Sequence, residues 1–181
     1  MLSTRRSRVR AAAATGMAVV AISVGAVTFN ASAQEVQAHP APSPNPTIAP
    51  PPGSTKVAEV HVQKGTQTYT CTGGVFTGTP STPEARLVGQ GGPFHHFAGP
   101  SWQSERDDSL VTATRKASSE VPGAIPELLL EVNSHTGSGI LSPVTHIQRL
   151  RTSGGVAPAG ACTDGEKVSV PYSATYVFWA A

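Results

Sequence analysis

The feature that most constrains the fold is a period of two in the apolar residues after position 55. From Val168 to Trp179, valine, alanine, tyrosine and phenylalanine occupy every second position, and Ala58, Val60 and Val62 alternate with polar neighbours. Successive side chains of a strand point to opposite faces, so this alternation predicts strands with one buried face. Other segments rich in β-branched and aromatic residues are 66–72, 110–113 and 144–150.

Glycine, proline and aspartate separate these segments. They cluster at 73–74, 91–93, 107–109 and 153–155. About seven or eight short strands at this spacing predict an all-β, single-domain antiparallel β-sandwich or barrel. The segment 125–131 is ambiguous, because it fits either a short helix or a strand buried on both faces. We interpret it as a strand.

The first 33 residues have the three parts of a secretory signal. Arg5, Arg6, Arg8 and Arg10 precede an apolar run over residues 11–29, and Ala-Ser-Ala follows at 31–33. The pattern predicts a signal peptide over residues 1–33, and an uncleaved membrane anchor is the alternative. After cleavage we expect no membrane span. The mature protein is then expected to be secreted or extracellular, either free or associated with the cell envelope.

Residues 34–55 read as a linker. They contain seven prolines and no aromatic residue. Such a composition favours an extended, disordered segment, either a spacer between the envelope and the domain or a tolerated tail. The β domain is therefore predicted over residues 56–181.

Removal of the leader reverses the sign of the net charge. Four of the 13 basic residues lie in the leader, which leaves nine against 11 acidic residues. The basic end serves targeting, and no stripe of lysine or arginine remains for a phosphate backbone. We therefore do not expect a nucleic acid partner.

Two cysteines, Cys71 and Cys162, lie in the exported part of the chain. In an oxidising compartment their pairing is the expected state, which predicts one disulfide, Cys71–Cys162. Two free buried thiols are the alternative. A metal site at these cysteines is not expected, since neither has a second cysteine or a histidine nearby.

Several blocks together resemble a known family of secreted proteins. The blocks are Tyr-Thr-Cys at 69–71, Gly-Pro-Ser-Trp at 99–102, Ala-Ile-Pro at 124–126 with three leucines at 128–130, Val-Thr-His-Ile-Gln-Arg at 144–149, Thr-Ser-Gly-Gly at 152–155, Ala-Pro at 157–158, and Val-Pro-Tyr-Ser-Ala at 170–174. In this order they are similar to the family called domain of unknown function 3455. The resemblance implies export and a shared fold. It implies no established activity, so it carries over no catalytic residue.

The densest aromatic cluster is the candidate ligand site. Phe94, His95, Phe97 and Trp102 lie around Gly99-Pro100 in a chain that is 6% aromatic. If the cluster is exposed, it could stack on a sugar ring or hold an apolar ligand. If it is buried, it is core, which is the usual place of aromatic residues in a small β domain.

Other polar residues offer weaker candidates. Arg149 and Arg151 are two residues apart on a predicted strand and would share a face, where they could hold an anion. Pairing with Glu127 or Glu131, or a solvated face, is the interpretation we favour. The adjacent His95 and His96 would point to opposite faces, so we expect no metal site there.

These observations favour a non-enzymatic binding module for a glycan or a small amphipathic ligand, with no cofactor. One alternative is a secreted hydrolase or metal-dependent enzyme that uses His95 or His96, His146, and Asp107 or Asp108. Another is a structural component of the envelope. The sequence does not set the oligomeric state.

Overall fold

The computed structural model describes residues 46–78 and 80–181 of the chain. The predicted signal peptide and residues 34–45 of the predicted linker lie outside the described residues. Within the described residues the elements are a short 3-10 helix and strands. They are η1 (Pro46–Ile48), β1 (Thr55–Thr72), β2 (Val75–Phe76), β3 (Thr82–Gln90), β4 (Phe94–Phe97), β5 (Ser101–Ser104), β6 (Leu110–Val121), β7 (Ala124–Thr136), β8 (His146–Gly154) and β9 (Lys167–Ala180).

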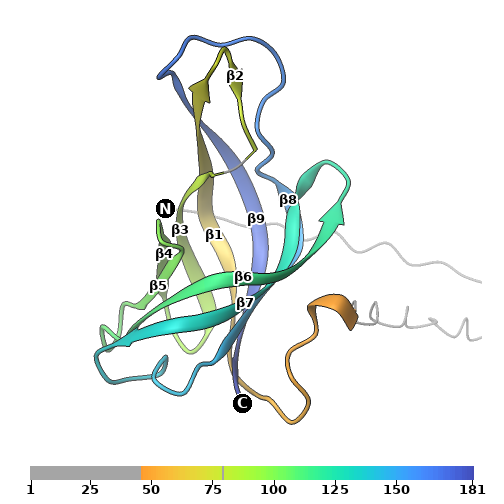
Figure 1. Cartoon of the computed structure of the whole chain (residues 1–181). Helices are drawn as coiled ribbons and strands as arrows, with labels where there is room; N and C mark the ends of the chain where they lie inside the picture. The colour runs from red at the N-terminus through yellow and green to blue at the C-terminus, as the bar shows by residue number, and fades with distance from the viewer. Residues whose placement is uncertain (1–45, 79) are drawn as a thin grey trace, which may run out of the picture. The chain divides into compact units, whose positions relative to one another are not determined.

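The strands form a closed antiparallel barrel. From β3 to β9 each strand pairs with its neighbour in sequence, and β1 pairs with both β3 and β9. The two-residue β2 pairs with the end of β1 and lies outside this ring of eight strands (Figure 1). Closure leaves no unpaired edge in the ring. The predicted all-β class is confirmed, and of its two forms the chain adopts the barrel.

Alternation along each strand decides which side chains fill the barrel. On β9 the residues Tyr172, Ala174, Tyr176 and Phe178 all belong to the buried core cluster, as their spacing of two requires. The ambiguous segment 125–131 lies within β7, so its interpretation as a strand is confirmed.

One end of the barrel is filled by apolar side chains, and we call it the closed end. Leu141 and Val144 of the β7–β8 loop are fully buried in its core. Asp107 holds that loop in place: its carboxylate accepts a bond of 3.0 Å from the Ile140 amide and one of 2.6 Å from the Ser109 hydroxyl. These bonds lower the pKa of Asp107 to about 2.

The opposite end, which we call the open end, carries the β1–β2, β4–β5, β6–β7 and β8–β9 connections. The β1–β2 hairpin and the β8–β9 loop extend together beyond the barrel in Figure 1. A disulfide joins them: Cys71 at the end of β1 is bonded to Cys162 in the loop, with a Cα–Cα distance of 6.0 Å. The predicted pairing is confirmed.

The segment that precedes β1 packs against the outside of the barrel. Ile48 is 1% exposed, and its carbonyl accepts a bond of 2.6 Å from Nε2 of Gln148. Gln148 follows the core residue Ile147, so it points outward. Residues 46–54, which composition places in the linker, thus contribute a buried side chain to the folded unit. No helix among the described residues has the length and apolar character needed to span a membrane.

Candidate functional site

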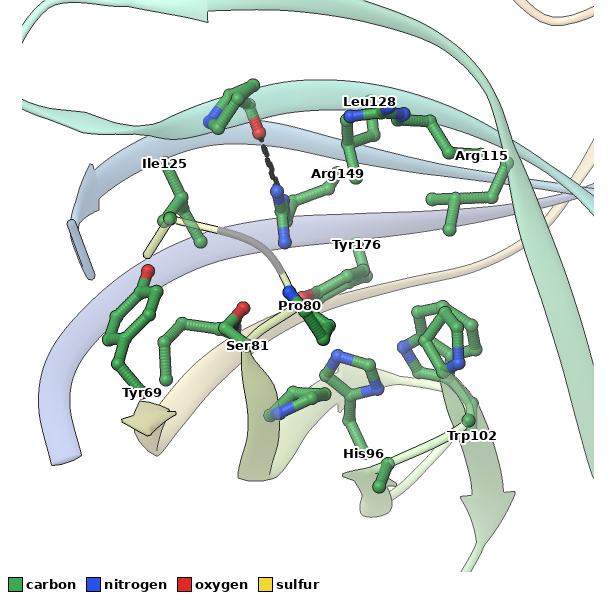
Figure 2. A pocket seen from close by; sticks show the side chains of 18 residues that line it. Tyr69, Pro80, Ser81, His96, Trp102, Arg115, Ile125, Leu128, Arg149 and Tyr176 are labelled. Carbon is green, nitrogen blue, oxygen red and sulfur yellow. Dashed lines mark hydrogen bonds between the residues drawn. The ribbon is translucent and has the colours of Figure 1, made fainter. Parts of the chain in front are cut away.

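A cavity of about 350 Å³ occupies the open end of the barrel. Its walls come from all eight barrel strands and from the β2–β3 and β4–β5 connections. Most of the wall is apolar and is formed by proline, leucine, isoleucine, alanine and glycine residues. The polar or aromatic side chains that line it are Gln67, Tyr69, Ser81, His96, Trp102, Arg115, Arg149 and Tyr176 (Figure 2).

Arg149 is a half-buried charged side chain in the cavity wall. It follows the core residue Ile147 by two positions on β8, which directs it inward. The β7–β8 pairing is irregular between Ala124 and Leu128, and there the Pro126 carbonyl accepts bonds from Nε and Nη2 of Arg149 at 3.1 and 2.9 Å. The guanidinium points toward Pro80 and Tyr176 in Figure 2. Among the described residues, no aspartate or glutamate forms an ion pair with Arg149.

His96 is a neutral, fixed side chain in the cavity wall. It is 2% exposed and stacks on Trp102, with ring centroids 4.4 Å apart. Burial lowers its pKa to about 3, against the effect of a bond to the Ser101 carbonyl, and the charge of Arg149 lowers the pKa further. Because a carbonyl only accepts, the ring nitrogen Nδ1, 2.9 Å from that oxygen, carries the proton. Nε2 is therefore the acceptor nitrogen.

Two buried donors in the wall lack partners. Nε2 of Gln67 and Nε1 of Trp102 make no hydrogen bond within the described part of the chain, although these side chains are 2% and 1% exposed. Gln67 is oriented by Ser81, whose hydroxyl donates to its Oε1 at 2.8 Å. A buried donor without an acceptor costs roughly 1–3 kcal/mol, so such groups usually have a reason. Ser54 and Thr152 also have unpartnered hydroxyls, but neither lines the cavity.

Tyr69 and Tyr176 complete the polar part of the wall, and Tyr172 lies beside Tyr176. The Tyr69 hydroxyl donates to the Gly155 carbonyl, and the hydroxyls of Tyr172 and Tyr176 lie 3.2 Å apart. Burial raises the pKa of all three phenols, and Arg149 opposes that rise. The phenols therefore stay neutral, and Arg149 is the cation that acts on all three.

The structure divides the predicted aromatic cluster between two faces. Phe94 is fully buried in the core and stacks on Phe178, while Trp102 lines the cavity. His95 and Phe97 lie on the outer face, where Nε2 of His95 is 2.6 Å from a Glu84 carboxylate oxygen. Trp102 is thus the one residue of the predicted site found in the cavity wall.

The expectation that Arg149 and Arg151 share a face is wrong. Arg151 has a left-handed backbone, with φ 52°, and the β8–β9 pairing is irregular between Leu150 and Ser153. Its side chain is 69% exposed and lies 3.6 Å from a Glu59 carboxylate oxygen. The break in alternation leaves Arg149 inside and sends Arg151 outside.

The residues predicted for an enzymatic site do not meet in the cavity. His96 lines it, whereas His95, Asp107, Asp108 and His146 do not. Within the described residues, no group of three or more histidine, cysteine, aspartate or glutamate side chains could hold a metal ion.

Sequence reasoning missed Gln67 and Tyr176 as members of the cavity wall. The available signal was a polar residue on the inward face of a strand that is otherwise apolar. On β9, Tyr176 is two positions from the core residue Phe178 and so shares its inward face. On β1, Gln67 lies on the same face as the core residue Val60, because the β1–β3 register shifts between Val62 and Lys64.

Comparison with known proteins gives a family and no activity. A family model described as "Protein of unknown function (DUF3455)" matches residues 51–180. No curated protein and no solved structure was found to be similar to the chain. The match covers all nine strands and well over half of the 181 residues, so the chain belongs to the DUF3455 family.

Proposed function

We propose that this protein is an exported, non-enzymatic binding protein that holds one small amphipathic molecule in the cavity of its barrel. Eight-stranded barrels are just wide enough either to be filled by side chains or to hold one small ligand. Here side chains fill the closed end, and a cavity of about 350 Å³ remains at the open end. That division supports a single ligand seated inside the barrel.

The observation that carries the proposal is the pair of unpartnered donors, Gln67 Nε2 and Trp102 Nε1, in an otherwise apolar wall. Binding sites combine an apolar lining with a few polar groups that fix the ligand's orientation. Both donor atoms lie just beneath the cavity surface, so a ligand acceptor would bond to either one once its side chain turns toward the cavity. The apolar part of the ligand would contact Ile125, Leu128 and Leu130.

A small amphipathic molecule suits this cavity better than a glycan does. A sugar would bring many hydroxyls into a wall whose area is mostly apolar, and each buried hydroxyl would need a partner. On the outer face, Phe97 and His95 form a patch of only two rings on which a glycan could stack.

Export is the second part of the proposal. The sequence of residues 1–33 supports it, and the Cys71–Cys162 disulfide is compatible with an oxidising compartment. Detection of the mature protein outside the cell, with a new N-terminus at Gln34, would test this part.

A thermal-melt panel on the purified, oxidised protein tests the binding function. The panel contains small apolar and amphipathic molecules, polysaccharides, divalent metals and a chelator. A ligand at about 100 times its Kd adds roughly 2.7 kcal/mol to stability, a shift that is easily seen. We expect amphipathic molecules to raise the Tm. A flat panel would contradict the proposal, and a metal response reversed by chelator would favour the enzymatic alternative.

A cavity-filling variant locates the response. Leu128→Trp adds an indole to the cavity wall and should abolish the Tm shift. Val75→Trp places the same side chain on β2, where Val75 is 51% exposed and outside the cavity, and should leave the shift unchanged. Equal responses in both variants would place the ligand elsewhere.

A further inference from the structure

Arg149 is a cation without a counterion in a largely apolar space. Two of its nitrogens donate to one carbonyl oxygen, that of Pro126, and no carboxylate of the described residues pairs with it. A guanidinium has five N–H donors, and its acceptors here, this carbonyl and the Tyr176 hydroxyl, are both neutral. Arg149 is half-buried, and the ordinary partner of a planar guanidinium is a carboxylate or a phosphate.

The neighbouring groups have the same preference for an acceptor. Gln67 Nε2 and Trp102 Nε1 are both donors and both lack a partner. The complement of two donors and a cation is a group that accepts hydrogen bonds and carries negative charge. An ionised carboxylate accepts and does not donate, so it matches all three.

The charge of the cavity wall favours an anion as well. None of the residues that line the cavity is an aspartate or a glutamate, whereas Arg115 is a second cation in the wall and is exposed. Arg115 forms no ion pair within the described part of the chain. Glu127, next to the lining residue Pro126, accepts a bond from the Arg151 amide. An exposed cation at a low-dielectric opening attracts anions from solution.

The size of the cavity limits the rest of the ligand. A cavity of roughly 150 Å³ holds benzene, so this one has room for about fourteen non-hydrogen atoms. One guanidinium inside the barrel matches a single negative charge. The apolar wall at Ile125, Leu128 and Leu130 would contact a hydrocarbon chain or ring.

We propose that the ligand is a small organic monocarboxylate, with its carboxylate paired to Arg149 and its apolar body inside the barrel. This inference rests on the proposed binding function and names the chemical class of the ligand. Gln67 and Trp102 line the same cavity, and each would donate to a ligand acceptor that comes within its reach.

Two probes of matched shape test the inference. Decanoate carries the carboxylate, and decanamide replaces it with a neutral amide on the same chain. In calorimetric titrations of the wild-type protein, we expect decanoate to bind at least about tenfold more tightly, since bonds to charged groups are the stronger ones. Equal affinities would overturn the inference and leave the proposed function standing. If neither probe binds, the inference is overturned, and the wider melt panel then decides the proposed function separately.

Variants of Arg149 assign the effect to this side chain. Arg149→Gln should weaken decanoate binding about ten- to hundredfold and change decanamide binding by less than about threefold. Arg149→Lys keeps the charge without the planar fork and should give an intermediate loss. Arg151→Gln removes an exposed cation of the same strand and should change neither affinity. Unchanged decanoate binding in Arg149→Gln would overturn the inference. If circular dichroism shows that this variant does not fold, Arg149→Lys and the wild-type comparison decide.

Discussion

The two ends of the barrel are built from the same eight strands, yet their inner faces carry different side chains. At the closed end the inward residues include Phe94, Ile147 and Phe178, which are fully buried. At the next inward positions of the same strands, toward the open end, stand His96, Arg149 and Tyr176. The change from apolar to polar thus falls within single strands, between neighbouring inward positions.

This difference separates the source of stability from the candidate site. The closed end buries apolar surface in close contact, which is the main favourable term in folding. The open end keeps empty space, two unpartnered donors and a cation, all of which reduce the stability of the ligand-free fold. Strand pairing continues through both ends, so the packed end can support the open one.

The largest expected effect is the loss of the disulfide, which belongs to the open end. It closes a loop with a sequence separation of 91 and should contribute about 4 to 5 kcal/mol in the chain-entropy model. The variant with Cys71→Ser and Cys162→Ser should lose that much in denaturant unfolding. Hydrogen exchange should rise most in the β1–β2 hairpin and the β8–β9 loop. A uniform rise that includes the β7–β8 loop would show that the two ends are not separate.

Paired truncations compare the two ends directly. Leu87 at the closed end and Leu130 in the cavity wall are 0% and 3% exposed. Leu87→Ala leaves a new void in packed surroundings and should cost about 4 kcal/mol, whereas Leu130→Ala enlarges existing space and should cost about 2 kcal/mol. Urea unfolding of both variants measures the difference. Equal losses would mean that the open end is packed as tightly as the closed end.

The sequence predicts most of the fold because alternation is a local property. The strand character of residues 168–179 follows from side-chain spacing alone, whereas spacing leaves residues 125–131 open between helix and strand. The choice between sandwich and barrel does not, since it depends on the pairing of β1 with β9 across more than a hundred positions of the chain. Local patterns contain no information on that closure.

The candidate site was harder to predict for two physical reasons. The aromatic cluster at 94–102 spans two strands, and alternation along β4 places Phe94 and His96 inside and leaves His95 and Phe97 outside. At Arg151 the left-handed backbone breaks the alternation, so spacing wrongly groups it with Arg149. In the first place closeness in sequence does not give a shared face, and in the second the departure from strand geometry is not evident from residue types.

Acid should weaken the open end through His96. The folded state keeps this ring neutral, with its pKa lowered to about 3 chiefly by burial, while the unfolded chain takes up a proton below about pH 6.5. The free energy of unfolding is therefore lower at pH 5 than at pH 7, by about 2 kcal/mol. The lowered pKa values of Asp107 and Glu131 act at lower pH, outside this window.

The measurement is urea unfolding at pH 7 and pH 5 for the wild type and for His96→Phe. The variant loses its bond to the Ser101 carbonyl at both pH values, but its stability should fall less between them. Burial also lowers the pKa of His146, so the same two measurements on His146→Gln give the part of the pH dependence that His146 contributes. An unchanged slope in His96→Phe would show that this ring is not the titrating group.

The smallest effect has the opposite sign and tests the role of the unpartnered donors. Gln67→Met keeps the length of the side chain, removes the donor Nε2 and leaves Ser81, a partly exposed residue, to bond with water. Replacement of a buried, half-satisfied polar group by an apolar one is close to neutral or stabilising, here by about 1 kcal/mol in the ligand-free protein. The same variant should bind decanoate more weakly than the wild type does. A gain in stability together with a loss of affinity would mean that Gln67 is kept for a ligand at the expense of the fold; a loss of both would make it a structural residue of the barrel wall.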